Sequence, residues 1–279
     1  MKKSKQRKPW TETRQWVLAE RKYEQVQAAY HKAVEEFWCN VPYLLEFVAS
    51  ARLSKNLNVT FTNGRREQIK VPGAQYDYRR TIEKGGCVSN RTEYEQWLSS
   101  MTRKKAEEGF QENVVFTIPI LRDLYGKRKD LRILELGPSY ESFVPEALED
   151  NLAIYAAVDL EETALQKQRE FLAARKSLSK RVLLLSTDSH QLQFVKDSFD
   201  LIVTNCHPPL VSATITQQCR LLETLYDCLA PGGELVIHPI RFEKKNPRIV
   251  KTMLRLFEIK AIAHRLNDST RKLLVLKKR

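Results

Sequence analysis

The sequence of 279 residues has few of the features that organise a metal centre, a disulfide framework or a phosphate-binding loop. Its five cysteines are an odd number, and no two of them form a Cys-x-x-Cys pair, which disfavours both disulfides and a zinc site. No Gly-x-x-x-x-Gly-Lys-Ser/Thr loop is present, which disfavours an NTPase. We therefore predict no metal site, and the cysteine usage favours a reducing, cytoplasmic setting.

Long apolar runs are also missing. No stretch approaches the roughly 18 uninterrupted apolar residues that a membrane span requires. Residues 1–10 are basic and lack the apolar segment of a secretory signal. Apolar residues still make up 42% of the chain, so disorder throughout is excluded and a substantial core is expected. We predict a soluble protein that has no membrane contact.

The net charge of +13 is unevenly distributed along the chain. Residues 1–130 contain 25 basic and 16 acidic residues, residues 131–240 contain 9 and 15, and residues 241–279 contain 13 and 3. An acidic middle segment therefore lies between two basic flanks. Because such a charge distribution attracts polyanions, we expect RNA or another polyanion to bind through residues 1–130 and 241–279. The pattern does not indicate an oligomeric state.

Residues 1–112 are predicted to form a basic, mainly helical accessory region that covers or shapes a binding site. Apolar residues recur at helical spacing in residues 11–39, and a second helix is expected at residues 43–53. Two strand-like runs then flank Asn63-Gly64, which predicts a short β-hairpin over residues 57–71 because both turn residues tolerate positive φ.

Residues 113–279 are predicted to form an α/β domain with a doubly wound, mostly parallel, seven-stranded Rossmann-like sheet. Continuous apolar strands alternate here with helical segments, as expected where helices cover both faces of a sheet. The expected strands are residues 132–136, 153–158, 182–185, 199–203, 234–237, 258–266 and 271–276. The expected helices lie near residues 141–150, 161–175, 212–229 and 246–257. The last two strands form a hairpin that adds an antiparallel strand to the sheet.

Polar residues follow several of these strands at their carboxyl ends, where doubly wound sheets bind ligands. Glu135 and Gly137 end the first strand, and Asp159 ends the second. Asp188 follows the third strand and Asn205 follows the fourth. These residues are expected to converge on one pocket, in which Asp159 accepts hydrogen bonds from ribose hydroxyls.

The order and spacing of these stretches resemble class I S-adenosylmethionine-dependent methyltransferases over residues 114–279. The resemblance implies the cofactor S-adenosyl-L-methionine and methyl transfer to an acceptor. The cofactor-binding residues it implies are Glu135, Gly137, Ser139, Tyr140, Asp159, Leu160, Asp188, Ser189 and Asn205. The first motif departs from the family pattern, because Ser139 and Glu141 stand where the family has its second and third glycines.

The segment from Asn205 to Pro209 resembles the Asn/Asp-Pro-Pro-Tyr loop of amino-methylating members of the family. It departs from that loop because two residues separate Asn205 from the prolines, and Leu210 replaces the aromatic residue. Asn205 and His207 are the candidate catalytic residues, with His207 as a general base because the pKa of histidine lies near neutrality. His238 is a second candidate base, at the end of the fifth strand.

Three functions remain open from the sequence. The leading hypothesis is methyl transfer from S-adenosylmethionine to RNA or another nucleic acid. A small-molecule methyltransferase with the N-terminal helices as a lid is the enzymatic alternative. A catalytically silent methyltransferase-like binding protein is the third, since the glycine-poor first motif would allow a fold that has lost its cofactor.

Overall fold

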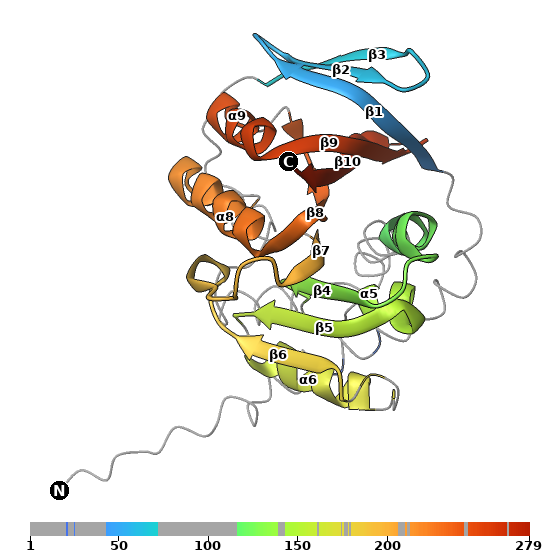
Figure 1. The fold of residues 1–279 in the computed structure, drawn as a ribbon, viewed down its shortest axis with the longest axis vertical. Coiled ribbons are helices and arrows are strands. Elements are labelled where there is room, and N and C mark those ends of the chain that lie inside the picture. Colours follow the sequence, from blue (N-terminus) through green and yellow to red (C-terminus); the bar gives the residue numbers. More distant parts are fainter. Residues whose placement is uncertain are drawn as a thin grey trace, which may run out of the picture.

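The protein contains a ten-stranded mixed β-sheet with helices on both faces (Figure 1). The computed structural model describes residues 43–71, 116–138, 143–160, 162–173, 180–205, 213–242, 245–266 and 268–279, and the single positions 21, 25, 175, 178 and 210. The strand order is β3-β2-β1-β9-β10-β8-β7-β4-β5-β6. In the described part of the chain, no helix is both long and apolar enough to cross a bilayer.

Five parallel strands form the centre and one edge of the sheet. They are β4 (Leu131–Leu136), β5 (Leu152–Asp159), β6 (Val182–Ser186), β7 (Phe199–Asn205) and β8 (Leu229–Ile240). All four neighbouring pairs among them are parallel. In chain order the arrangement reads 3-2-1-4-5, the order of a doubly wound sheet. The apolar runs that predicted the strands are largely buried in β4, β5 and β7, whereas β6, at the edge, is only partly buried.

The C-terminal hairpin adds two further strands. They are β9 (Phe257–Arg265) and β10 (Asp268–Lys278). Strand β10 lies between β8 and β9 and is antiparallel to both, so the predicted antiparallel insertion is confirmed. These seven strands, β4 to β10, correspond to the predicted seven-stranded sheet.

The predicted sheet is too small, because three N-terminal strands extend it. They are β1 (Tyr43–Leu53), β2 (Leu57–Phe61) and β3 (Arg66–Ile69), all joined by antiparallel pairing. Strand β1 also pairs with β9, which joins the hairpin to the main sheet. Of the nine neighbouring pairs, four are parallel and five antiparallel, so "mostly parallel" describes the β4–β8 part and is wrong for the whole sheet.

The predicted helix over residues 43–53 is wrong, whereas the hairpin after it is confirmed. The apolar residues of this segment fit helical spacing, but pairing with β9 and β2 satisfies its backbone groups as a strand. In the hairpin, Gly64 has φ of +85°, and its N–H donates to Phe61 O at 2.9 Å. The remaining parts of the predicted accessory region, residues 1–42 and 72–112, lie outside the described residues except positions 21 and 25.

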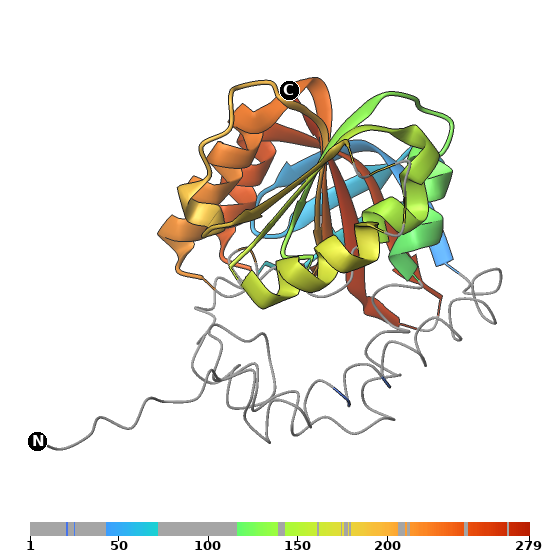
Figure 2. The same ribbon diagram turned by 90° about the horizontal axis from the view of Figure 1, so that it is seen from below.

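Helices cover the two faces of the sheet in two groups (Figure 2). The first group consists of residues 116–125, α5 (Phe143–Leu148) and α6 (Glu162–Ala173). The second group consists of α8 (Ile215–Cys228) and α9 (Pro247–Leu256). The two short 3-10 helices are η2 (Glu149–Asn151) and η3 (Ser189–Gln191). All four helices expected in the α/β domain are therefore present, with ends shifted by a few residues.

The starts of α8 and α9 follow from their sequences. Thr214 caps α8 in a reciprocal capping box with Gln217. Asn246 caps α9, its side chain accepts from the N–H of Arg248, and Pro247 occupies the first helical turn. These caps satisfy backbone donors that have no partner inside the helix.

The hydrophobic core consists of two clusters separated by the sheet. One cluster joins β2 and β3 to α8, α9 and one face of the sheet. The other joins residues 116–125, α5 and α6 to the opposite face. Alternate residues of β4 enter different clusters, Leu134 the first and Ile133 the second. Burial of these apolar side chains, at about 25 cal/mol per Å² of apolar area, is the dominant stabilising term.

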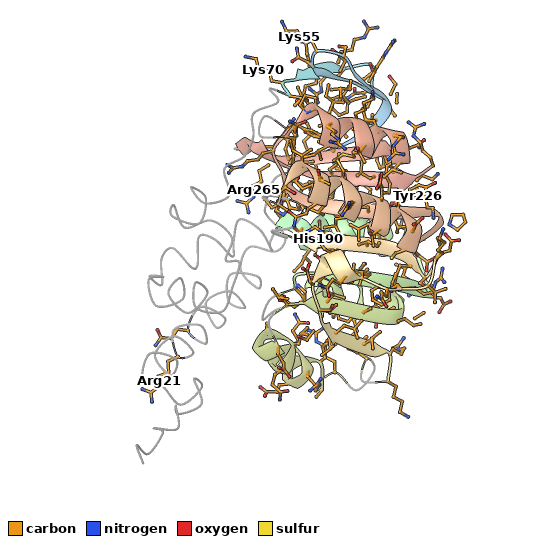
Figure 3. The ribbon with its side chains drawn as sticks, turned by 90° about the vertical axis from the view of Figure 1, so that its left-hand side faces the viewer. Arg21, Lys55, Lys70, His190, Tyr226 and Arg265 are labelled. Atoms are coloured by element: carbon orange, nitrogen blue, oxygen red, sulfur yellow. The ribbon has the colours of Figure 1, made fainter. Side chains whose placement is uncertain are left out.

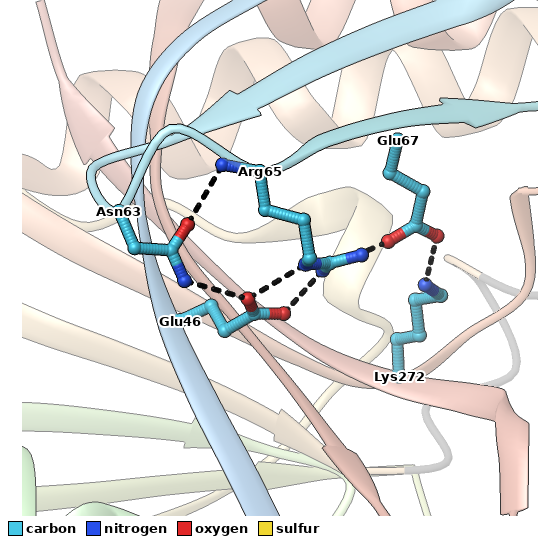
Figure 4. A network of polar contacts seen from close by, with 5 residues as sticks. All are labelled: Glu46, Asn63, Arg65, Glu67 and Lys272. Carbon is cyan, nitrogen blue, oxygen red and sulfur yellow. Dashed lines mark hydrogen bonds and ion pairs between the residues drawn. The ribbon is translucent and has the colours of Figure 1, made fainter.

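A polar network ties the hairpin to the main sheet (Figure 4). Arg65 donates through Nε to Glu46 Oε1 at 2.8 Å and through its terminal nitrogen to Glu67 Oε2 at 3.2 Å. Lys272 Nζ of β10 donates to Glu67 Oε1 at 2.6 Å, and Asn63 donates to Glu46. The hydrogen bond from Arg65 lowers the pKa of Glu46. Burial alone would raise the pKa of Glu67, but Lys272 and Arg65 outweigh burial and lower that pKa.

Candidate active site

The sheet reverses its strand order between β4 and β7, which is where doubly wound sheets bind ligands. At this point Leu136 of β4 pairs with Val158 of β5 and with Thr204 of β7. The next residues along the three strands are Gly137, Asp159 and Asn205. Adjacent strands lie about 4.8 Å apart, so the backbones of the three residues lie next to one another at the carboxyl ends of the parallel strands.

Gly137 forms the turn that leaves β4. Its φ is +67°, in the left-handed region that an L-residue with a side chain rarely adopts. Its N–H donates to Val158 O at 2.8 Å, which fixes the turn against β5. Ser139 and Tyr140, the other first-motif residues, lie outside the described residues, as does Glu141.

Glu135 lies inside β4, and its side chain is fully buried. Its Oε2 accepts a hydrogen bond from the Tyr155 hydroxyl of β5 at 2.7 Å. A buried carboxylate requires such donors because desolvation opposes its charge. The pair joins β4 to β5 two residues before the Gly137 turn, so the placement of Glu135 supports the turn from within the sheet.

Asp159 is the last residue of β5 and is partly exposed. Its backbone carbonyl accepts from the Thr187 N–H at 3.0 Å, and its register partner is Ser186 at the end of β6. Leu160 follows directly and is 63% exposed, which is unusual for a large apolar side chain. A carboxylate and an apolar surface therefore lie side by side at the carboxyl end of β5.

Asp188 and Ser189 lie two and three residues beyond the end of β6. Asp188 caps the 3-10 helix η3, and its Oδ1 accepts from the His190 N–H at 2.9 Å. Ser189 is buried within η3. Asp188 is thus held in a defined position just beyond the end of β6, the strand that pairs with the strand of Asp159.

Asn205 is the last residue of β7 and pairs with His238 of β8. Its side chain and residues 206–209, including His207, lie outside the described residues. His238 itself is 3% exposed. Its Nδ1 lies 3.2 Å from Thr117 Oγ1, and its ring packs 5.2 Å from that of Phe116. The geometry of His238 is that of a buried contact between β8 and the helical residues 116–125.

A buried lysine, which the sequence did not single out, holds the chain that follows Asn205. Lys245 Nζ donates to Leu210 O and, at 2.9 Å, to Gln218 Oε1. Gln218 Nε2 in turn donates to Ala213 O at 2.6 Å. Leu210, Gln218 and Lys245 line one small cavity with apolar residues of α8, α9 and β8. Burial lowers the pKa of Lys245 to about 8.

The sequence alone does not indicate that Lys245 is buried. It lies in the strongly basic segment 241–279, where the sequence offers no way to separate one buried lysine from many exposed ones. Within the described ranges, no group of three His, Cys, Asp or Glu side chains is placed to hold a metal ion.

A family model described as "Methyltransferase domain" matches residues 127–272, just over half of the chain. That range includes the Gly137 turn, Asp159, Asp188 and Asn205. The chain belongs to the class I S-adenosylmethionine-dependent methyltransferase family. The resemblance predicted from the strand-end residues is thereby confirmed, and no curated protein matches the sequence.

Several solved methyltransferase structures are similar to this family member at low identity. N-methyltransferase NodS from Bradyrhizobium japonicum WM9 in complex with S-adenosyl-L-homocysteine has 16% identity and a TM-score of 0.48, covering 72% of this chain and 96% of NodS. An S-adenosylmethionine-dependent methyltransferase from Mesorhizobium loti has 20% identity and a TM-score of 0.47, covering 58% and 96%. TrmN from Thermus thermophilus has 20% identity and a TM-score of 0.45, covering 58% and 48%.

Proposed function

We propose that the protein transfers the methyl group of S-adenosylmethionine to an acceptor bound beside the carboxyl end of β7, and that this acceptor is RNA. The observation that carries the cofactor part is the convergence of Gly137, Asp159 and Asp188 on one edge of the sheet, next to the reversal of strand order. The RNA part rests on the basic flanks of the chain.

The residues at this edge fit an adenosyl sulfonium. The backbone at Gly137 has a positive φ and carries no Cβ, so a ligand can approach it closely. The Asp159 carboxylate can accept hydrogen bonds from ribose hydroxyls, and the exposed Leu160 can cover one face of the adenine. Asp188, fixed at the start of η3, can accept from the adenine amine. Ser189 lies beside it, while Ser139 and Tyr140 are assigned to the same pocket from their sequence positions.

When bound, S-adenosylmethionine supplies an activated methyl group on a positively charged sulfur. The chain contributes chiefly by holding the acceptor atom close to that methyl group and in line with it. Asn205, at the end of β7, would hold the acceptor. His207 would accept the proton that an amine or hydroxyl acceptor loses. Glu135 acts within the sheet through Tyr155 and holds the Gly137 turn in place.

Isothermal titration with S-adenosylmethionine and S-adenosylhomocysteine tests the cofactor part. Asp159→Ala should weaken binding about tenfold or more, because a hydrogen bond to a charged group contributes about 1.5–3 kcal/mol. Asp227→Ala is the matched control, since Asp227 is an exposed aspartate on α8 whose nearest ion-pair contact is Lys196 at 3.8 Å. Wild-type protein that takes up neither ligand would contradict the proposal and favour the silent binding protein.

Methyl transfer from radiolabelled S-adenosylmethionine into total RNA and into a small-molecule extract tests the acceptor. Label that enters RNA and falls with His207→Ala supports RNA as acceptor and His207 as base. Label confined to the small-molecule fraction would contradict RNA and favour the metabolite methyltransferase. Unchanged turnover of His207→Ala would remove this residue from the mechanism.

A further inference from the structure

The three-stranded unit β1–β2–β3 has an inner and an outer face of opposite character. Alternate residues of β2, namely Leu57, Val59 and Phe61, point into the core with α9. The residues between them point outward, in register with the outward residues of β1 and β3. The outward hairpin face is defined here by Arg52, Lys55, Asn58, Arg66, Gln68 and Lys70.

Side-chain amides form a polar band across this face. Arg52 pairs in register with Asn58, which pairs with Gln68. Gln68 Nε2 donates to Asn58 Oδ1 at 3.0 Å, and Asn58 Nδ2 donates to Ser54 Oγ at 3.1 Å. Cations lie on both sides of the band, at Arg66 in β3, at Lys70 directly after β3, and at Lys55 in the turn between β1 and β2. Figure 3 shows Lys55 and Lys70 at the outer end of the molecule.

Within residues 43–71, acids do not offset the positive charge of this face. Residues 43–71 contain two acidic residues, Glu46 and Glu67, and both are neutralised by Arg65 and Lys272 on the inner side (Figure 4). Within the described part of the chain, no ion pair engages Arg52, Lys55, Arg66 or Lys70, and all four are exposed. Four uncompensated cations therefore surround a band of hydrogen-bonding amides.

We propose that the outward hairpin face binds the backbone of single-stranded RNA, which deepens the proposed function by assigning the acceptor a docking surface. Arg66 and Gln68 of β3 and Lys70 directly after it are spaced at about 6.7 Å, so cationic and amide groups alternate along the edge of the sheet. Cations match phosphates, and amides can bind the ribose hydroxyls that distinguish RNA from DNA. None of the six residues of the outward hairpin face is a large apolar side chain that could insert into a lipid bilayer; the exposed Leu44 and Phe47 lie in the part of β1 that pairs with β9.

The position of this face suits an RNA acceptor. Strands β1 and β3 lie four and six strand steps from β7. At about 4.8 Å per step, these separations are on the order of 20 and 30 Å. About six to nine nucleotides, with a rise of about 3.4 Å each, span them. Backbone contacts at the hairpin could therefore hold an RNA whose target nucleotide reaches the end of β7.

Fluorescence anisotropy of a labelled 20-nucleotide RNA with the full-length chain tests the proposal. The variant carries Arg52→Gln, Lys55→Gln, Arg66→Gln and Lys70→Gln together. We expect its affinity to fall at least about tenfold at physiological salt, and the slope of log affinity against log salt to become shallower by about 2 to 3, since each phosphate contact contributes about 0.7.

A second variant separates this surface from the net charge of the protein. It removes an equal number of charges at exposed positions outside the basic flanks, with Arg169→Gln, Lys180→Gln, Lys196→Gln and Arg220→Gln. We expect this variant to stay within threefold of wild type. Equal weakening in both variants would overturn the proposal, because the long-range field and not the hairpin would then bind the RNA.

Further measurements test whether RNA is the ligand of the outward hairpin face. Replacing Arg52 and Arg66 by Lys keeps the charges and should retain affinity within threefold. A DNA 20-mer of the same sequence should bind more weakly than the RNA; equal affinity, or binding of anionic phospholipid vesicles in place of RNA, would overturn RNA as the partner. Titration of the hairpin variant with S-adenosylhomocysteine should match wild type, so a failure of the cofactor proposal remains distinguishable from a failure of this one.

Discussion

The buried Lys245 makes the stability of this protein depend on pH in a direction that can be derived. Burial lowers its pKa from 10.5 to about 8, so between these values the unfolded chain binds a proton that the folded chain has released. The free energy of unfolding therefore rises with pH across this window. At about 1.4 kcal/mol per pKa unit, the charged lysine costs the folded state about 3 kcal/mol at pH 7.

Replacement of Lys245 by Met removes this titration. The methionine fills the small cavity with an apolar side chain but leaves Leu210 O and Gln218 Oε1 without their donor, so its effect at any single pH mixes two opposing terms. The pH dependence isolates the charge. Between pH 7 and pH 9.5, the difference in unfolding free energy between wild type and variant should shift by about 2 kcal/mol in favour of wild type.

Urea denaturation at a series of pH values measures this difference. Burial raises the pKa of Cys228 to about 11, so this thiol also contributes to the pH dependence of stability near the upper end of the pH series. Its contribution is the same in wild type and variant, and it therefore cancels in the difference between their unfolding free energies. Lys251→Met, at an exposed site on α9, is the matched control and should give a curve parallel to wild type. Parallel curves for Lys245→Met and wild type would refute the reasoning, because they would mean that Lys245 keeps an ordinary pKa in the folded protein.

Three further changes test the sheet and its ligand-binding edge. Gly137→Ala should lower the unfolding free energy by about 1 kcal/mol and should also weaken the binding of S-adenosylhomocysteine. Gly64→Ala, which introduces a side chain at a similar positive φ in the hairpin, should lower stability but leave binding unchanged. Equal binding by both variants in titration calorimetry would contradict the assignment of the Gly137 turn. Tyr155→Phe should cost about 1–3 kcal/mol in urea denaturation, because it removes a donor from the buried Glu135, and an unchanged midpoint would mean that the carboxyl is satisfied without it. Leu225→Ala, at a fully buried position of α8, should cost about 2–5 kcal/mol by the same assay, and a loss below 1 kcal/mol would show that the core there collapses around the smaller side chain.

The β4–β8 part of the fold could be predicted because its sequence pattern allows few alternatives. Strands such as Leu131–Leu136 and Phe199–Asn205 contain short apolar runs on successive residues, Ile133-Leu134 and Leu201-Ile202-Val203, as is typical of a sheet covered on both faces. The Asn63-Gly64 turn was predictable for a local reason, since its backbone requires positive φ.

Strand β1 could not be predicted because its structure depends on distant partners. Leu44, Leu45, Phe47 and Val48 fit helical spacing as well as an edge of a sheet. The choice is made by pairing with β9, more than 200 residues later in the chain, and with β2. Lys245 is a similar case, because its burial arises only when α8 and α9 pack together around Leu210.

The absence of two glycines from the first motif weakens the proposed cofactor site less than the sequence alone indicates. A glycine is indispensable where the backbone adopts positive φ, and the described part of the motif has that conformation at Gly137, where the glycine is retained. Ser139 and Glu141 carry side chains where the family has glycines. Glycine is needed at those positions only where a ligand approaches the backbone closely. The acids that would bind adenosine are Asp159, at the end of β5, and Asp188, at the start of η3, and neither depends on the motif's later residues. Retention of Gly137 together with these two acids therefore favours a cofactor-binding member of the family over a silent one. Titration of the wild-type chain decides between the two, and Gly137→Ala against Gly64→Ala tests whether the turn contributes to binding.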